Sequence, residues 1–382
     1  GASLWMLPAM FLVGLVIALV LRANAAHVHR LYGADLAGGG IGCLLVLPLM
    51  NRVGGDDGIF LIGALACAGA FFLAHADGAR ACRAIGLGAL CLCLAGPWLN
   101  RERALVDVRS HGTGVPGVSD SLNEQHELAR IWNALSRLGI FEVKDGSSLY
   151  VRIDSGCQTG IPSTDAKYEA GIVRSSTFER LPFVLDRHRR YLEIGAGGGR
   201  QMVLAKALGA ERVVGVEINP GIVSSSMTGF PGYGVGPRMA ADPDFVLVED
   251  EGRRWARSAE ERFDAATITF IQTGVASGSA AFALSEANLF TVEAFVEFLR
   301  RVDDDGLFYI YRHGGNETLR LLSMARAALG ELGVRDVTQH LYAAINNENR
   351  TIVLIGRAPF RTDEIAKLDQ ACGELGLNIL YS

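Results

Sequence analysis

The chain has 382 residues, which is long enough for two domains, and 49% of them are hydrophobic. Its net charge of −5 and its lack of any block of lysine and arginine give no reason to expect a nucleic-acid partner. Its seven cysteines are scattered and form no C-x-x-C pair, so the sequence indicates neither a metal site nor a disulfide framework.

Four uncharged runs lie within the first hundred residues, at 5–21, 36–50, 59–74 and 84–99. A helix needs about 20 residues to cross the hydrocarbon core, with a lower limit of about 17, so the last three runs need flanking residues among the headgroups. We predict a transmembrane helical region over 1–100 with three or four spans, four being preferred. The alternative is the buried helical core of a soluble domain. The small residues within 33–42 should let helices approach closely.

A linker and a helix are predicted between this region and the C-terminal domain, within 101–147. The helix should cover 121–138, where apolar residues recur near helical spacing. These residues are Leu122, Leu128, Ile131, Leu135 and Leu138. A short strand at 148–153 then opens the C-terminal domain, which should extend over 148–382.

The stretch 190–220 is typical of one β-α-β unit. A strand at 191–194 is followed by a glycine-rich turn, a helix at 202–208 and a second strand at 212–218, in which Glu217 is the last acid. Backbone N–H groups at a helix N-terminus bind negative charge, and an acid at the end of the second strand bonds ribose hydroxyls. The pattern therefore predicts a nucleoside site, and a glycine turn without a ligand is the alternative.

The glycine spacing distinguishes between nucleoside cofactors. A dinucleotide fingerprint needs glycine at the position of Arg200. The observed pattern is G-x-G-G-G, with Glu193 two residues upstream; we take as ligand-binding glycines Gly195, Gly197 and Gly199. This pattern resembles motif I of class I S-adenosylmethionine-dependent methyltransferases and of polyamine synthases. The resemblance implies that the turn lies against the amino-acid end of the ligand and that Glu217 binds the ribose.

The remaining chain alternates strands and helices, which predicts a doubly wound α/β sheet. Strands are expected at 244–248, 264–271, 306–311, 334–342 and 349–357, and helices at 290–300 and 318–332. A terminal strand pair fits a methyltransferase-type sheet better than a nicotinamide-type sheet. We therefore predict a Rossmann-like class I methyltransferase sheet preceded by a small transmembrane bundle.

Several separated segments of 148–382 resemble the spermidine synthase family. The family's N-terminal β-segment has a nucleoside-contacting glutamine, to which Gln158 corresponds, and its third-strand segment has an adenine-binding aspartate, to which Asp250 corresponds. The sequence at 289–295 is similar to the helix after the family's active-site loop. The resemblance implies S-adenosylmethionine or its decarboxylated form as co-substrate, and a homodimer.

The whole chain is similar to a bacterial group in which a membrane bundle precedes such a domain, as the sequences at 33–36 and 281–290 indicate. We expect an integral protein of the bacterial inner membrane with a cytoplasmic C-terminal domain, because the cofactor is made in the cytoplasm. The flanking arginines give this orientation no support from the positive-inside rule. The chain begins at Gly1 rather than methionine, so further membrane segments can precede it.

The segment after the fourth strand departs from the family. Spermidine synthases use two aspartates there to hold a polycation and to deprotonate an amine. Aligned on Asp264, those positions fall at Thr269 and Gln272, and neither is charged. The pocket would then suit a neutral acceptor, either a lipid or a small molecule. His313 is a candidate base, with a packing role as the alternative, and the weaker candidates are Glu286 and Tyr168.

Three hypotheses follow. The first is a membrane-anchored transferase that uses S-adenosylmethionine or its decarboxylated form on a non-polyamine acceptor. The second is an aminopropyltransferase with relocated acids, drawn from Glu249, Asp250, Glu251 and Glu286. The third is a non-enzymatic nucleoside-binding module coupled to the membrane bundle.

Overall fold

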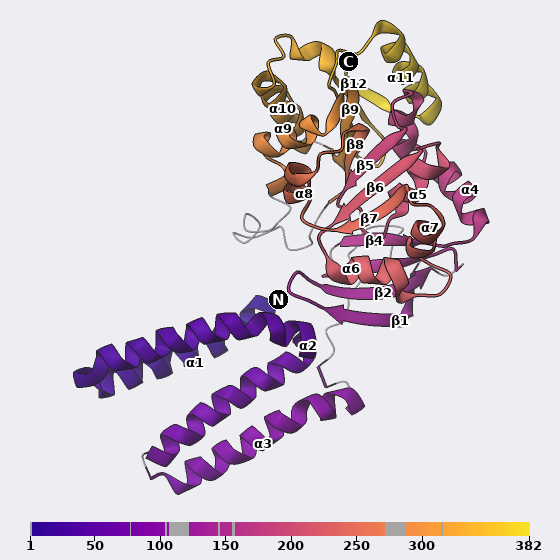
Figure 1. The fold of residues 1–382 in the computed structure, drawn as a ribbon. Coiled ribbons are helices and arrows are strands. Elements are labelled where there is room, and N and C mark those ends of the chain that lie inside the picture. The colour runs from indigo at the N-terminus through magenta and orange to yellow at the C-terminus, as the bar shows by residue number, and fades with distance from the viewer. Residues whose placement is uncertain are drawn as a thin grey trace. The chain divides into compact units, whose positions relative to one another are not determined.

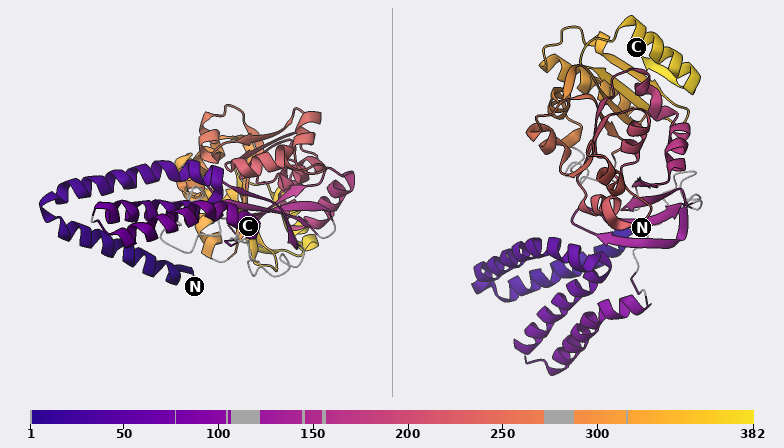
Figure 2. Two further views of the ribbon diagram at one scale, coloured as in Figure 1. Left: turned by 90° about the horizontal axis from the view of Figure 1, so that it is seen from below. Right: turned by 45° about the vertical axis from the view of Figure 1, so that its right-hand side comes forward.

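The computed structural model describes residues 2–76, 78–103, 105–106, 122–143, 146–154, 157–271, 288–314 and 316–382. Contacts within the chain divide it into two compact units. One comprises residues 1–108 and 132–134, and the other comprises 109–131 and 135–382. The first unit is helical, and the second contains the sheets (Figures 1 and 2).

The first unit consists of three long helices: α1 (Ala2–Ala23), α2 (Val28–Ala76) and α3 (Arg80–Arg103). Helix α2 is interrupted at Gly54, where φ is 79° and ψ is 171°, so the four uncharged runs occupy four helical segments. Among the residues that the structure describes, two stretches, 25–76 and 80–103, are long and apolar enough to cross a membrane by length and composition. The fully described part of α1, Phe11–Ala23, is shorter than one span, so the predicted number of spans stays a prediction.

Glycines bring α2 and α3 into close contact. A Cβ atom on Gly96 would lie 2.2 Å from the ring of Phe60, and one on Gly86 would lie 3.3 Å from the Cα atom of Phe71. For the glycines within 33–42, a Cβ atom would have nothing within 4 Å among the described residues, so the expectation that helices approach closely there stays a prediction. Small residues permit a close approach but need a neighbouring helix to produce one.

A four-stranded sheet begins the second unit. Its strands are β1 (Leu122–Trp132), β2 (Arg137–Val143), β3 (Ser148–Ile153) and β4 (Cys157–Pro162), in that spatial order. The predicted helix at 121–138 is therefore wrong. Leu138 and Ile140 alternate along β2 and pack against Val151, so the strand period outweighs the approximate helical spacing.

The larger sheet has eight strands in the order β12-β10-β11-β9-β8-β5-β6-β7. Their bounds are β5 (Arg190–Ile194), β6 (Arg212–Glu217), β7 (Phe245–Glu249), β8 (Phe263–Thr269), β9 (Val302–His313), β10 (Leu341–Ile345), β11 (Arg350–Gly356) and β12 (Asn378–Tyr381). Strands β5 to β9 run parallel, whereas β10, β11 and β12 add antiparallel pairs. This mixed sheet is the predicted Rossmann-like, methyltransferase-type architecture.

Helices cover both faces of this sheet (Figure 1). One face carries α8 (Gly252–Ser258), α9 (Val292–Arg300) and α10 (Asn316–Glu331). The other carries the 3-10 turn η3 (Phe178–Val184), α5 (Arg200–Ala207) and α11 (Thr362–Leu375). Because the parallel strands are buried on both faces, most of their central residues are apolar.

Shorter helices complete the unit at the carboxyl edge of the parallel strands and beside the small sheet. They are α4 (Ala166–Ser175), α6 (Pro220–Ser224), the π-helix η4 (Ser225–Gly229) and α7 (Gly236–Ala241). Asn219 caps α6 by accepting a hydrogen bond from the Gly221 N–H group at 3.0 Å. Because Asn219 lies two residues after Glu217, the last residue of β6, the cap holds the backbone in place directly after Glu217.

Candidate functional site

The turn between β5 and α5 can only be made by glycines. Gly195, Gly197 and Gly199 have φ values of 73°, 57° and 90°, in the left-handed region that L side chains rarely adopt. A Cβ atom on Gly197 would lie 2.1 Å from the Thr159 hydroxyl, and one on Gly199 would lie 2.3 Å from Val235. The turn is therefore held tightly by β4 and by the segment before α7.

Glu217 links the second strand to this turn. One of its carboxylate oxygens accepts a hydrogen bond from the Gly197 N–H group at 2.9 Å, and the other accepts from Asn219 N–H at 2.8 Å. Burial raises the pKa of Glu217, and these backbone donors act in the opposite sense. Each carboxylate oxygen has two lone pairs, so each can also accept a hydrogen bond from a hydroxyl group. The arrangement suits a carboxylate that binds a ribose diol.

Glu193 lies on β5 and is only 1% exposed. Its Oε2 atom has no hydrogen-bond partner among the residues that the structure describes. Burial raises the pKa of Glu193 well above its ordinary value, with Thr269 and Arg200 opposing and Glu217 reinforcing the shift. Glu193 is therefore a buried carboxyl group whose protonated form is favoured.

We expect Glu193→Gln to stabilise the protein at alkaline pH. Because the folded-state pKa is raised, the wild-type protein should lose stability as pH rises from the unfolded value of about 4.3 through the folded value. Glutamine cannot ionise, so at pH 8 the variant should be more stable by about 1–3 kcal/mol. Urea denaturation at pH 5 and pH 8 measures the difference.

Glu211→Gln serves as the control for this pH series, because the Glu211 carboxylate pairs at the surface with Arg189 and is 62% exposed. Its stability profile should keep the wild-type fall towards alkaline pH. An unchanged fall in Glu193→Gln would show that another group is responsible.

The structure brings the other predicted nucleoside-binding residues to the same edge. Asp250 directly follows β7, accepts a hydrogen bond from the Glu251 N–H group at 2.6 Å and pairs with Arg254. Gln158 has an exposed side chain on β4, and its neighbour Thr159 accepts a hydrogen bond from the Gly198 N–H group at 3.0 Å. These positions surround the carboxyl ends of β5, β6 and β7, where ligands of open α/β sheets bind. Their ligand-binding roles remain predictions.

The predicted acceptor-side residues are described only in part. Thr269 is the last residue of β8, and its buried hydroxyl lies beside the Glu193 carboxyl group. His313 is the last residue of β9, and its side chain lies outside the described residues, as do Gln272 and Glu286. Sequence reasoning missed Phe270, whose φ of 45° is rare for an aromatic residue. No sequence signal indicates this backbone conformation.

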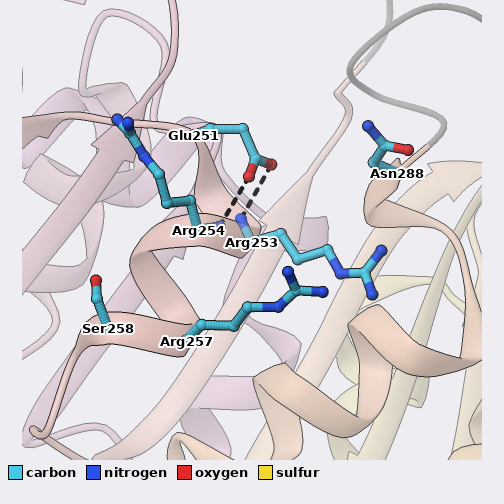
Figure 3. A pocket seen from close by; sticks show the side chains of 6 residues that line it. All are labelled: Glu251, Arg253, Arg254, Arg257, Ser258 and Asn288. Atoms are coloured by element: carbon cyan, nitrogen blue, oxygen red, sulfur yellow. Dashed lines mark hydrogen bonds between the residues drawn. The ribbon is translucent and has the colours of Figure 1, made fainter.

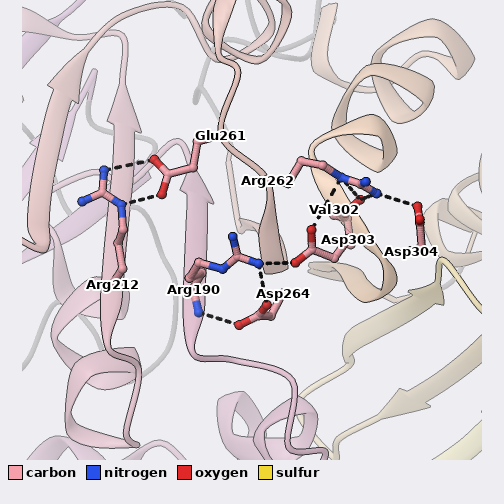
Figure 4. Close-up of polar contacts among 8 residues, drawn as sticks. All are labelled: Arg190, Arg212, Glu261, Arg262, Asp264, Val302, Asp303 and Asp304. Carbon is pink, nitrogen blue, oxygen red and sulfur yellow. Dashed lines mark hydrogen bonds and ion pairs between the residues drawn. The ribbon is translucent and has the colours of Figure 1, made fainter.

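Asp264 lies at the opposite edge of the sheet from the glycine turn. Its carboxylate accepts a hydrogen bond from the Arg190 backbone N–H group at 2.8 Å, and the Arg190 side chain also pairs with Asp303 (Figure 4). Arg212 and Glu261 form a further pair, with a shortest distance of 2.5 Å. These contacts join the amino ends of β5, β8 and β9, so Asp264 has a structural role far from the site.

A cavity of about 500 Å³ lies beside α8 and contains several arginines. Its lining consists of Glu251, Arg253, Arg254, Arg257, Ser258 and Asn288 (Figure 3). Glu251 caps α8 by accepting from two backbone N–H groups, at 3.0 and 2.7 Å. Arg253 and Arg257 both bind Glu297 on α9, and Arg254 pairs with Asp250. Since every arginine is paired with an acid, this network joins α8 to α9 and does not form an anion site.

Comparison with known proteins gives distant structural similarity. No family model and no curated protein matches the chain. Solved structures similar to it include a spermidine synthase in complex with the transition-state analogue AdoDATO (15% identity, TM-score 0.43, covering 67% of this chain and 81% of that one). A probable spermidine synthase from Corynebacterium glutamicum has 14% identity, a TM-score of 0.44 and coverage of 66% and 90%. Human methyltransferase-like protein 13 in complex with SAH has 15% identity, a TM-score of 0.34 and coverage of 55% and 92%. At these identities the similarity concerns the fold and assigns no activity to this chain.

Proposed function

We propose that the protein is a transferase that binds S-adenosylmethionine or its decarboxylated form and alkylates a non-polyamine acceptor. The contact between Glu217 and the Gly197 N–H group carries the proposal, because it joins a buried carboxylate to the glycine turn at the carboxyl edge of the sheet. Such a carboxylate can hold ribose hydroxyls while the turn lies against the rest of the nucleoside.

The chemistry requires an acceptor nucleophile to attack a carbon bonded to the sulfonium. The carbon–sulfur bond breaks, the neutral thioether nucleoside leaves, and the acceptor gives up its proton to a base. His313 is a candidate base because it ends β9, next to the β8 strand that Thr269 ends. A positively charged polyamine would need carboxylates here, but Thr269, Phe270 and Ile271, the described residues at the end of β8, are uncharged.

Of the four candidate relocated acids, Glu286 lies outside the described residues, and the other three do not favour a polyamine acceptor. Glu251 is engaged in capping α8, and Asp250 is paired with Arg254. Glu249 ends β7 with an exposed side chain, and β7 is an edge strand three strands away from β8 in the sheet order. A non-polyamine acceptor is therefore the better match to the described part of the site.

We further propose that the first unit anchors the protein in the bacterial inner membrane, with the sheet-containing unit in the cytoplasm. Large apolar side chains of this unit are strongly exposed, among them Leu44 (77%), Leu65 (73%) and Ile85 (71%). Exposed apolar surface on this scale is costly in water and favourable in lipid. An anchored enzyme would be well placed to use a lipid acceptor.

Calorimetry on the full chain in neutral detergent tests the proposal. The ligands are S-adenosylmethionine, its decarboxylated form and methylthioadenosine, and we expect at least one to bind. A preference for S-adenosylmethionine indicates methyl transfer, and a preference for the decarboxylated form indicates aminopropyl transfer. If a folded protein binds none of them, the transferase proposal is wrong. If it binds but shows no turnover with any acceptor, a nucleoside-binding module without catalysis is the better description.

A further inference from the structure

A second cavity, of about 430 Å³, lies beside the glycine turn. It is formed by β3, the residue after β4, the helix α4 and the first residue of α5. Its polar lining includes one carboxylate, Asp165, and the donor side chains Ser148, Tyr150, Ser163, Lys167, Tyr168 and Arg200. The cavity thus combines two cations and several hydroxyl groups, all of which can donate hydrogen bonds, with one exposed carboxylate.

The two cations of this cavity are not neutralised by acids. Within the described residues, neither Lys167 nor Arg200 forms an ion pair, and Arg200 donates to the Ser176 hydroxyl at 2.9 Å. Asp165 in the lining and Glu169 on the same helix have other contacts. Asp165 is exposed and caps α4 by accepting from the Lys167 N–H group at 2.9 Å, and Glu169 pairs with Arg238 at 3.0 Å.

Arg200 connects this cavity to the candidate nucleoside site. It directly follows Gly199, and a Cβ atom on Gly160 of β4 would lie 3.5 Å from the Arg200 Cδ atom. Its charge opposes the raised pKa of Glu193 on the nucleoside side and that of Tyr168 on the cavity side. Burial is the main cause of the raised pKa of Tyr168, which keeps the phenol protonated as a donor.

We propose that this cavity binds an oxyanion, a phosphate or carboxylate group, on the acceptor substrate. The inference rests on the proposed transferase function and defines the acceptor as acidic, the opposite of a polyamine. Arg200 offers a planar set of N–H donors that suits phosphate and carboxylate geometry, and Lys167 adds a second charge at the rim. The oxyanion could belong to a phospholipid headgroup or to a soluble phosphorylated compound, and the two sources share this chemistry.

Inorganic phosphate is the first probe, titrated into the full chain in neutral detergent and followed by ³¹P NMR. We expect saturable binding that weakens about tenfold in Arg200→Gln and in Lys167→Gln, because each loses one charge–anion contact. Arg189→Gln is the matched control, since it removes an exposed arginine that pairs with Glu211. Its phosphate affinity should equal that of the wild-type protein. Thermal melting confirms that each variant is folded, and Lys167→Gln alters only an exposed side chain.

Methylthioadenosine binding is measured in the same samples, so that the two proposals can fail separately. Equal phosphate affinity in the wild-type protein and both cavity variants, with methylthioadenosine still bound, overturns the oxyanion site and leaves the transferase proposal standing. If the folded wild-type protein binds none of methylthioadenosine, S-adenosylmethionine and its decarboxylated form, the transferase proposal is wrong, and with it the assignment of the oxyanion to an acceptor substrate. Phosphate titrations in nanodiscs then identify the source of the oxyanion. If phosphatidylglycerol, but not phosphatidylcholine, competes with phosphate for the cavity, the oxyanion belongs to a lipid headgroup. If neither lipid competes with phosphate, the acceptor is soluble.

Discussion

Replacing Arg187 by methionine is expected to lower the free energy of unfolding by about 3–5 kcal/mol. Arg187 is 9% exposed. Its guanidinium donates hydrogen bonds to the Glu364 carboxylate on α11 and to the backbone carbonyl of Asp305 on β9. Without Arg187, the buried charge of the Glu364 side chain, which is 3% exposed, is balanced only by Arg361. That residue contributes an ion pair at 3.2 Å and a hydrogen bond from its backbone N–H group. Urea denaturation followed by circular dichroism measures the loss.

Arg189→Met is the matched control, because it breaks another arginine–glutamate pair only two residues away. In that pair the side chains of Arg189 and Glu211 are 69% and 62% exposed, so the loss should stay below about 1 kcal/mol. The double variant Arg187→Met/Glu364→Leu should recover much of the lost stability, since no buried charge remains. Equal losses in the two single variants would mean that burial adds nothing to the Arg187 pair.

The parallel part of the sheet could be predicted because burial on both faces leaves a clear pattern. The predicted strand at 264–271 corresponds to β8 at Phe263–Thr269, and the predicted helix at 290–300 corresponds to α9 at Val292–Arg300. Leu192, Ile194 and most residues of the parallel strands are buried and apolar, so each strand is a mostly apolar stretch in the sequence with few polar residues. The spacing of the glycines then predicts the turn between β5 and α5.

Other elements were missed for different physical reasons. The hairpin of β1 and β2 was mistaken for a helix, because leucines at mixed spacings fit both periods until partner strands select one. Helix α11 was overlooked although its signal is present: Leu368, Ala371 and Cys372 are buried along one helical face, and Glu364 binds back to the Arg361 N–H group at 3.0 Å. Strand β12 is short and exposed and gives little signal.

The candidate site likewise has a part that the sequence predicts and a part that it does not. Glu193, the glycines and Glu217 lie within 25 residues of sequence, so one local pattern predicts their meeting. The oxyanion cavity, by contrast, draws on Tyr150, Lys167 and Arg200, which belong to β3, α4 and α5. No sequence spacing relates them, and only the packing of the small sheet against the glycine turn brings their side chains together.

Glu217→Gln is expected to weaken nucleoside binding by about 10- to 100-fold, the equivalent of one hydrogen bond to a charged group, at about 1.5–3 kcal/mol. The carboxylate accepts from the N–H groups of Gly197 and Asn219, and glutamine has only one accepting oxygen for these two donors. Its amide nitrogen would face a backbone donor and turn away from it, which disturbs the glycine turn as well as the ribose contact. Calorimetry with methylthioadenosine on the full chain measures the change.

Glu249→Gln separates this effect from a general loss of negative charge at the edge of the sheet. Glu249 is the register partner of Glu217 at the end of the adjacent strand β7, but its side chain is exposed. Removing its charge should change nucleoside affinity by less than about threefold, because solvent screens an exposed carboxylate. If the two variants lost affinity equally, nucleoside binding would depend on the total negative charge at this edge of the sheet and not on a contact with the Glu217 carboxylate. Selective loss in Glu217→Gln would instead identify a specific ribose contact, which the buried, doubly hydrogen-bonded geometry of this carboxylate predicts.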